Sequence, residues 1–367
     1  MQGPRHIGRG TSMRYRKLGR TNLEISEIGI GGIGPMGKYG PVAADGTSAR
    51  DPGEPTGSYR GNPHFEVAPE GFARTMARAE ELGVNFLDTA PSYGRSEEIF
   101  GHYLKNPRQR QNWIVCTKTG VCGSMGDGAA MAETEIVAMA EASLERLQID
   151  EIDVLLIHSV DQYGTGTQAL EHMVESGMVA ALEKLKTAGK IRFFGISGML
   201  PQLSAAAESD LFDVTLTYNT YNLLVRDAEQ EFLPLSVEKN FGVLLGGVFH
   251  GGLLSGDAGS LSRKAVERFY EVGDPGLHLS GPIIEWAERL QAFAGGDGAD
   301  LRRLGLRFAL SHPGVSTIVS GIRNIAEIEE NAAAVMAGPL SAEEQSALAE
   351  ALAGMPKISW NTRAQKP

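Results

Sequence analysis

The chain has 367 residues, of which 42% are hydrophobic and 22% charged, and its net charge at pH 7 is −11. This length allows a large buried core that needs no disulfide or metal for folding, and a single (β/α)8 barrel can reach this size. The sequence has no dense Lys/Arg run, which argues against nucleic-acid binding, and no apolar run approaches the ~20 residues that span a bilayer.

The two cysteines, Cys116 and Cys122, lack the spacing of a zinc site, and no metal is expected. We expect plain thiols, one in a strand and one in a loop, in a reducing cytoplasm. Residues 1–12 are rich in Gly and Arg but have no apolar segment, so they do not form a secretory signal. They are predicted to be a disordered tail, residues 13–358 a single barrel domain, and residues 359–367 a C-terminal tail.

Along the chain, the first pattern is an alternation over residues 14–30 around Gly19-Arg20, which predicts a short β-hairpin. Residues 31–63, crowded with Gly, Pro, Ser and Asp, predict a long loop. From there on, helical patterns alternate with short apolar runs. The predicted helices are at about 66–82, 94–105, 131–147, 169–188, 200–208, 226–239, 300–311 and 324–335. The predicted strands are at 28–30, 84–87, 113–116, 153–157, 191–196, 214–217, 243–245 and 317–319.

Short apolar strands suit a parallel sheet that is buried on both faces, and eight strand–helix units favour a closed (β/α)8 barrel. An open doubly wound sheet is the alternative, but the glycines of residues 31–34 lack the Gly-x-Gly-x-x-Gly spacing and open no helix. A second irregular stretch, 247–282, follows the seventh strand and should lie over the C-terminal mouth. A last helix, 341–353, begins with Ser341 and acidic residues, which is typical of a helix start.

Reactive side chains follow three neighbouring strands. Asp88, Lys118 and His158 come at or just after strand ends, and Tyr93 lies on the loop after Asp88. The ends of barrel strands converge, so we expect these four groups to meet. A tyrosine, with a pKa of about 10, is a weak base at neutral pH, but a neighbouring ammonium favours its phenolate. The carboxylate would keep the buried lysine charged, and the histidine would orient a substrate oxygen.

Such a set can move a proton on or off a carbonyl or alcohol oxygen while a nicotinamide carries the hydride. Each residue alone has a structural explanation: a helix N-cap, a solvated charge, a packed ring or a core histidine. The presence of all four side chains at or just after neighbouring strand ends favours a catalytic site.

Residues 85–97, NFLDTAPSYGRSE, resemble the signature of the aldo-keto reductase family. The resemblance covers about residues 13–336. It implies a (β/α)8 barrel that binds NAD(P)H without a Rossmann domain and is closed at its bottom by the hairpin. It also implies that the catalytic Asp, Tyr, Lys and His are Asp88, Tyr93, Lys118 and His158.

The resemblance further implies a cofactor site. Ser197 and Gly198 would meet the nicotinamide carboxamide, although the family usually has Asn at the second position. Tyr218, where many members have Gln, would lie under the nicotinamide ring. The glycine-rich run 246–254 would close over the pyrophosphate, and the start of the last barrel helix would bind the adenosine phosphate. The residues implied in these two segments are Gly247, Phe249, Gly252, Leu254, Gly321, Arg323, Glu327, Glu330 and Asn331.

Cofactor choice depends on the adenosine end. Many NADPH-preferring members have Lys at the Gly321 position and Arg at the Glu327 position. Glu327 would repel a 2′-phosphate, whereas Arg323 could pair with one. The pattern therefore favours NAD, with NADP as the alternative.

Residues 195–198, Tyr218 and the run 246–254 are similar to one branch of the family, that of L-galactose dehydrogenase, D-threo-aldose 1-dehydrogenase and pyridoxal 4-dehydrogenase. The first hypothesis is therefore oxidation of a sugar-like lactol (an aldose) to a lactone. The second is NADPH-dependent reduction of an aldehyde or ketone in a tailoring pathway. The third is a nucleotide-sensing subunit with little turnover. The expected partner is a small carbonyl, alcohol or lactol substrate, and the oligomeric state is left open.

Overall fold

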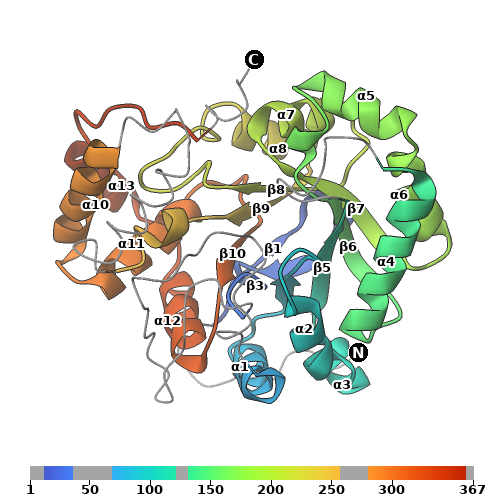
Figure 1. Ribbon diagram of the computed structural model, residues 1–367. Helices are drawn as coiled ribbons and strands as arrows, with labels where there is room; N and C mark the ends of the chain where they lie inside the picture. The colour runs from blue at the N-terminus through green and yellow to red at the C-terminus, as the bar shows by residue number, and fades with distance from the viewer. Residues whose placement is uncertain (1–11, 36–67, 121–130, 257–279, 361–367) are drawn as a thin grey trace.

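The computed structural model describes residues 12–35, 68–120, 131–256 and 280–360 of the chain. Its parallel strands form a closed barrel in the order β10-β3-β4-β5-β6-β7-β8-β9, with helices around the outside (Figure 1). The predicted (β/α)8 class is confirmed. The strands are β3 (Ile28–Gly31), β4 (Phe86–Asp88), β5 (Ile114–Thr119), β6 (Ile152–Ile157), β7 (Ile191–Gly198), β8 (Val214–Tyr218), β9 (Gly242–Gly246) and β10 (Thr317–Gly321).

The predicted hairpin precedes the barrel and closes its N-terminal end. Strand β1 (Tyr15–Lys17) pairs antiparallel with β2 (Glu24–Ser26) through a short 3-10 turn. Leu18 and Ile25 are fully buried in the same apolar cluster as the barrel residue Phe86. The hairpin therefore supplies the apolar side chains that fill the bottom of the barrel.

The outer helices alternate with the strands, and an ion pair of 2.7 Å between Arg78 and Glu329 joins the first to the last of the ring. They are α1 (Pro69–Glu81), α2 (Ser96–Leu104), α3 (Pro107–Arg110), α4 (Glu133–Leu147), α5 (Thr167–Glu175), α6 (Met178–Thr187), α7 (Leu200–Glu208), α8 (Phe232–Lys239), α10 (Ser280–Ala294), α11 (Gly298–Ala309), α12 (Ile325–Met336) and α13 (Ala342–Ala351).

Two predicted helices differ in extent from those of the structure, and the structure has two helices that were not predicted, the short α3 and α10. The pattern at 169–188 is split into α5 and α6 by Gly177, whose φ of +87° ends one helix and starts the next. The pattern at 226–239 forms a helix only from Phe232 onward. Helix α10 begins at Ser280, within the stretch predicted to be irregular, and it buries Ile283, Ala287 and Leu290 at a helical spacing.

Several expectations lie outside the described residues. They are the N-terminal tail up to residue 11, residues 36–63 of the first long loop, residues 257–279 of the second, Cys122, and the C-terminal tail from residue 361. Within the described ranges, no helix has the length and apolar character needed to cross a bilayer.

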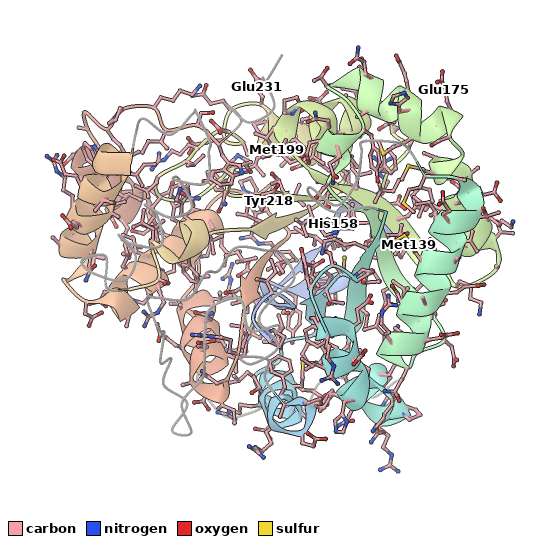
Figure 2. All side chains as sticks on the ribbon, in the orientation of Figure 1. Met139, His158, Glu175, Met199, Tyr218 and Glu231 are labelled. Carbon is pink, nitrogen blue, oxygen red and sulfur yellow. The ribbon has the colours of Figure 1, made fainter. Side chains whose placement is uncertain are left out.

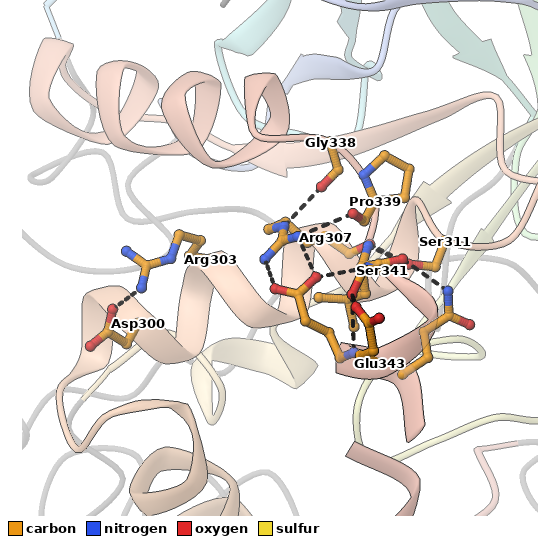
Figure 3. A network of polar contacts seen from close by, with 11 residues as sticks. Asp300, Arg303, Arg307, Ser311, Gly338, Pro339, Ser341 and Glu343 are labelled. Carbon is orange, nitrogen blue, oxygen red and sulfur yellow. Dashed lines mark hydrogen bonds and ion pairs between the residues drawn. The ribbon is translucent and has the colours of Figure 1, made fainter. Parts of the chain in front are cut away.

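Arg307 ties the C-terminal helix α13 to α11 (Figure 3). Its guanidinium donates to both carboxylate oxygens of Glu344, at 2.6 and 2.7 Å, and to the carbonyl oxygens of Gly338 (2.9 Å) and Pro339 (3.1 Å). The Ser341 hydroxyl accepts from the Glu344 amide and the Glu344 carboxylate from the Ser341 amide, at the helix start that the sequence predicted.

We expect Arg307→Met to lower the free energy of unfolding by about 2 kcal/mol at pH 7, because two carbonyls and a carboxylate lose a charged donor. Hydrogen bonds from Arg307 lower the pKa of Glu344 to about 2. A carboxyl whose folded pKa is depressed stabilises the fold above its unfolded pKa of about 4.3, and that contribution is lost as pH falls toward 2.

The difference between wild type and variant, measured by urea unfolding, should therefore shrink below about pH 4. Arg303→Met is the matched control, since Arg303 lies one turn earlier on α11 with a side chain 54% exposed. It should cost under about 0.5 kcal/mol. Equal losses in the two variants would contradict the role given to Arg307.

Candidate active site

The four predicted catalytic residues lie together at the carboxyl ends of β4, β5 and β6. Asp88 ends β4, Lys118 lies near the end of β5, and His158 directly follows β6. In the parallel register Asp88 pairs with Cys116 of β5, so Lys118 reaches beyond Asp88 on the same inward face. All four side chains are buried, including Tyr93 on the loop between β4 and α2.

The Lys118 ammonium is held by three acceptors. Its Nζ donates to the two carboxylate oxygens of Asp88, at 2.7 and 2.8 Å, and to the carbonyl oxygen of Thr89 at 2.8 Å. An ammonium has three hydrogens, so each finds a partner although the side chain is 0% exposed. Burial raises the pKa of Asp88, and the Lys118 ammonium opposes that rise. The pair therefore fixes a positive charge inside the barrel mouth, which a solvated surface lysine would not do.

Tyr93 lies between this charge and the histidine. The Lys118 Nζ is 4.8 Å from the centroid of the Tyr93 ring. The Tyr93 and His158 rings meet edge to face, with centroids 5.7 Å apart. The arrangement gathers a cation, a phenol and an imidazole around one point, as the sequence predicted.

His158 is a neutral imidazole in this setting. Burial lowers its pKa well below the usual range, and the Lys118 ammonium lowers it further. Its Nδ1 is 3.5 Å from the Ser92 hydroxyl oxygen, and its backbone amide donates to the Thr119 carbonyl at 2.9 Å. A neutral ring keeps one N–H to donate to a substrate oxygen.

The residues expected to bind a cofactor lie at the ends of the other barrel strands. Ser197 and Gly198 end β7, Tyr218 ends β8, and Gly321 ends β10. Figure 2 shows His158 and Tyr218 near the middle of the barrel. The parallel strands thus bring both halves of the predicted site to one face of the molecule.

The structure explains why glycine stands at position 198. A Cβ there would lie 3.0 Å from an Asp161 oxygen and 3.0 Å from a Val160 methyl carbon. The short 3-10 turn after β6 therefore fills the space that a longer side chain would need. Ser197 keeps a polar role, since its hydroxyl accepts from the Ser159 amide at 3.2 Å.

The predicted pyrophosphate segment follows β9 as a tight turn. Gly247, Gly251 and Gly252 have φ values of +70°, +65° and +100°. Among the described residues, no atom lies within 4 Å of the place where a Cβ of Gly251 would be. Phe249 is half-buried and Leu254 is fully buried, so the turn is anchored by apolar side chains, and within the described ranges Gly251 is left uncovered.

At the adenosine end, acidic and basic side chains are already paired. The Arg323 guanidinium and amide both donate to Glu327, whose own amide donates to Asn324 at 2.9 Å. Two further predicted residues are engaged within the protein: Glu330 accepts from Arg302 at 2.6 Å, and the Asn331 amide donates to Ser320 at 3.4 Å.

Two residues at the mouth were missed by the sequence reasoning. Trp360, the second residue of the predicted C-terminal tail, lies edge to face against Tyr218 (centroids 6.5 Å apart) and His250 (5.7 Å). Its backbone amide donates to Asp227 at 2.7 Å, and the Ser359 hydroxyl donates to the same carboxylate at 3.0 Å. Burial lowers the pKa of His250 to about 4. The alternating apolar pair Ile358 and Trp360 could have indicated this packed segment.

These features fit a nicotinamide dinucleotide. The open glycine turn allows a pyrophosphate to approach the backbone closely, and amide groups in such turns attract anions. Tyr218 is a partly exposed aromatic ring at the end of β8. Asn219, beside it, has a buried side-chain oxygen with no hydrogen-bond partner in the described part of the chain. Such a buried polar group is a site for a ligand or a water.

Comparison with known proteins agrees with this geometry. The model of the Aldo/keto reductase family matches residues 57–353. The chain is 30% identical to L-galactose dehydrogenase of Arabidopsis thaliana over 335 residues, 89% of each chain. It is 26% identical to pyridoxal 4-dehydrogenase of Microbacterium luteolum over 352 residues, 86% of this chain and 91% of the relative.

Among solved structures, the holo form of an aldo-keto reductase from Bacillus halodurans superposes with a TM-score of 0.68 at 25% identity. The match covers 96% of this chain and 100% of that one. The expected resemblance, including the branch of the family, is confirmed. The structure is a parallel barrel with a hairpin at its N-terminal end, and the family model matches most of the chain. The chain therefore belongs to the aldo/keto reductase family.

Proposed function

We propose that this protein oxidises a sugar-like lactol to a lactone with NAD as hydride acceptor, and that Asp88, Tyr93, Lys118 and His158 are its catalytic residues. The observation that carries the proposal is the buried Lys118 ammonium, bonded to Asp88 and 4.8 Å from the Tyr93 ring. The similarity to L-galactose dehydrogenase supports the choice of a lactol.

Each of the four side chains has a separate role in removing the proton of the substrate hydroxyl group. The Lys118 ammonium stabilises the Tyr93 phenolate, which takes the proton of the hydroxyl group. The neutral His158 imidazole donates a hydrogen bond to the same oxygen and fixes its position. Asp88 keeps Lys118 charged in the buried site. When bound, the nicotinamide supplies the acceptor for the hydride that leaves the carbon. In the reverse direction Tyr93 would return its proton to a carbonyl oxygen.

Ser197, Tyr218 and the turn 247–254 would hold the nicotinamide and the pyrophosphate, and the start of α12 would hold the adenosine. A panel of lactols and aldehydes with NAD and NADP, followed at the reduced nicotinamide absorbance, tests the reaction. We expect NADH to appear with a lactol. NADPH consumption with aldehydes alone would favour the reductase hypothesis, and cofactor binding without turnover on any compound would favour a nucleotide-sensing subunit.

We infer the preference for NAD from the pair between Arg323 and Glu327. Glu327 neutralises the guanidinium, and its carboxylate would repel a 2′-phosphate bound beside Arg323. A carboxylate can instead accept a hydrogen bond from a free ribose hydroxyl. We therefore expect the protein to bind NAD more tightly than NADP.

We expect Glu327→Lys to tighten NADP binding roughly 10- to 100-fold relative to NAD, because Arg323 is released and a second cation is added. Dissociation constants from protein fluorescence would measure the change. Glu329→Lys makes the same charge change on the same helix at an exposed position that pairs with Arg78, and it should leave the ratio within about threefold. An unchanged ratio for Glu327→Lys would show that the adenosine binds elsewhere.

A further inference from the structure

Glu97 is a buried carboxylate outside the four proposed catalytic residues. It is the second residue of α2, directly after the loop that carries Tyr93, and it is 1% exposed. One carboxylate oxygen accepts from the Thr117 hydroxyl at 2.6 Å, and the other accepts from Arg146 Nε at 2.6 Å. It therefore links α2 to β5 through Thr117 and to α4 through Arg146.

Thr117 precedes Lys118 in β5, and side chains of successive strand residues point to opposite faces. Lys118 points into the barrel and donates to the carbonyl of Thr89, where the Tyr93 loop begins. Thr117 points outward and donates to Glu97, where the loop has ended. Adjacent residues of one strand thus hold the two ends of the loop.

The loop itself is closed by short hydrogen bonds between these attachments. The Thr89 hydroxyl donates to the Ser96 hydroxyl at 2.8 Å, and the Ser96 amide donates to the Tyr93 carbonyl at 3.0 Å. Helix α2 packs closely on α4, since a Cβ on Gly101 would lie 2.3 Å from the Arg146 carbonyl oxygen. The bonds of Glu97 therefore tie the end of the Tyr93 loop to β5 and to α4.

We propose that Glu97 is a positioning residue that sets the separation between the Tyr93 phenol and the Lys118 ammonium through Thr117 and Arg146. This inference rests on the proposed function, because it gives that separation a catalytic meaning. The Glu97 carboxylate is buried while the Arg146 side chain is 34% exposed, and burying a paired carboxylate is often no more stabilising than burying apolar side chains of equal volume, so stability alone does not account for the charged group here. Directional hydrogen bonds from two elements fix a distance that apolar packing would leave adjustable.

The test uses Glu97→Gln and Thr117→Val, with Thr117→Ser as the conservative rescue. The direct readout is the tyrosinate absorbance of Tyr93, obtained by subtracting the same protein carrying Tyr93→Phe. We expect both variants to move the titration midpoint upward by about one pH unit, because the ammonium lies farther from the phenol. The kcat should fall roughly tenfold or more while KM for the cofactor stays within about threefold. Thr117→Ser keeps the hydroxyl, so its titration midpoint and its kcat should stay close to those of the wild type.

Asp153→Asn is the matched control. Asp153 is also a buried carboxylate, bonded to Arg110 at 2.8 Å and to Arg192 at 2.5 Å, but it lies near the opposite end of the strands. It should lower stability without moving the tyrosinate midpoint. Unchanged midpoints in Glu97→Gln and Thr117→Val, or an equal shift in Asp153→Asn, would overturn the inference. The titration needs no turnover, so full activity of Tyr93→Phe would refute the proposed function separately.

Discussion

Tyr93→Phe should lower kcat/KM by roughly 10²- to 10⁴-fold, the range expected when a positioned acid–base group is removed. The ring would remain in place, because it packs with Ala90 and Ile33 and against His158. Only the oxygen that exchanges the proton would be lost. The dissociation constant of the cofactor should change by less than about threefold, since the residues proposed to bind it lie on other strands.

The control for this variant is Tyr221→Phe. Tyr221 is also buried, and its ring lies 4.9 Å from that of Phe308 rather than beside Lys118. Removing its hydroxyl should leave kcat/KM within about threefold of wild type. More than a tenth of the activity remaining in Tyr93→Phe, or a loss of cofactor binding in that variant, would contradict the assignment of Tyr93 as the proton-transferring group.

The barrel and the four proposed catalytic residues were predictable from sequence because local patterns and one topological rule determine them. Short runs such as Val154–Ile157 are apolar on both faces, and only a parallel sheet covered on both sides accommodates many such runs. Once the strands are closed into a barrel, their carboxyl ends must converge. Asp88, Lys118 and His158 could therefore be placed together without any knowledge of their contacts.

Other features depend on contacts that no local pattern contains. The helix predicted from residue 226 begins at Phe232, residues 227–231 form a turn, and Asp227 in that turn accepts hydrogen bonds from the Ser359 hydroxyl and the Trp360 amide. Those partners lie more than a hundred residues later in the chain. In the same way, Gly198 looks like a lost cofactor contact in the sequence, whereas the structure gives it a steric cause in Asp161 and Val160.

The proposed cofactor preference draws partly on the sequence and partly on contacts that only the structure contains. Glu327 could be identified from its position relative to the family pattern, and its carboxylate argued against a 2′-phosphate. Its partner is also visible in the structure: Glu327 bonds both the amide and the guanidinium of Arg323. The residue that could have bound a phosphate is thereby the one that Glu327 neutralises. The sequence alone presented the two as opposing indications.

Lys118→Met should lower kcat/KM to a similar extent as Tyr93→Phe. It should also destabilise the protein by about 3–5 kcal/mol, because it leaves the Asp88 carboxylate buried without its cation. Its stability should also depend on pH. Without the ammonium the pKa of Asp88 rises further above the unfolded value of about 3.9, so the folded state binds a proton more tightly than the unfolded state. The free energy of unfolding must then fall as pH rises from about 4 toward the folded pKa.

The double variant Asp88→Asn/Lys118→Met separates the two effects. Removing the carboxylate as well should return most of the lost stability and abolish its pH dependence, because no buried charge remains unpaired. It should return no activity, since the Tyr93 phenolate still lacks the ammonium that stabilises it. Urea unfolding at several pH values and turnover with a lactol would measure both. If the double variant were active, or if Lys118→Met kept a tenth of wild-type turnover, the buried ammonium would not be the source of the tyrosine's basicity.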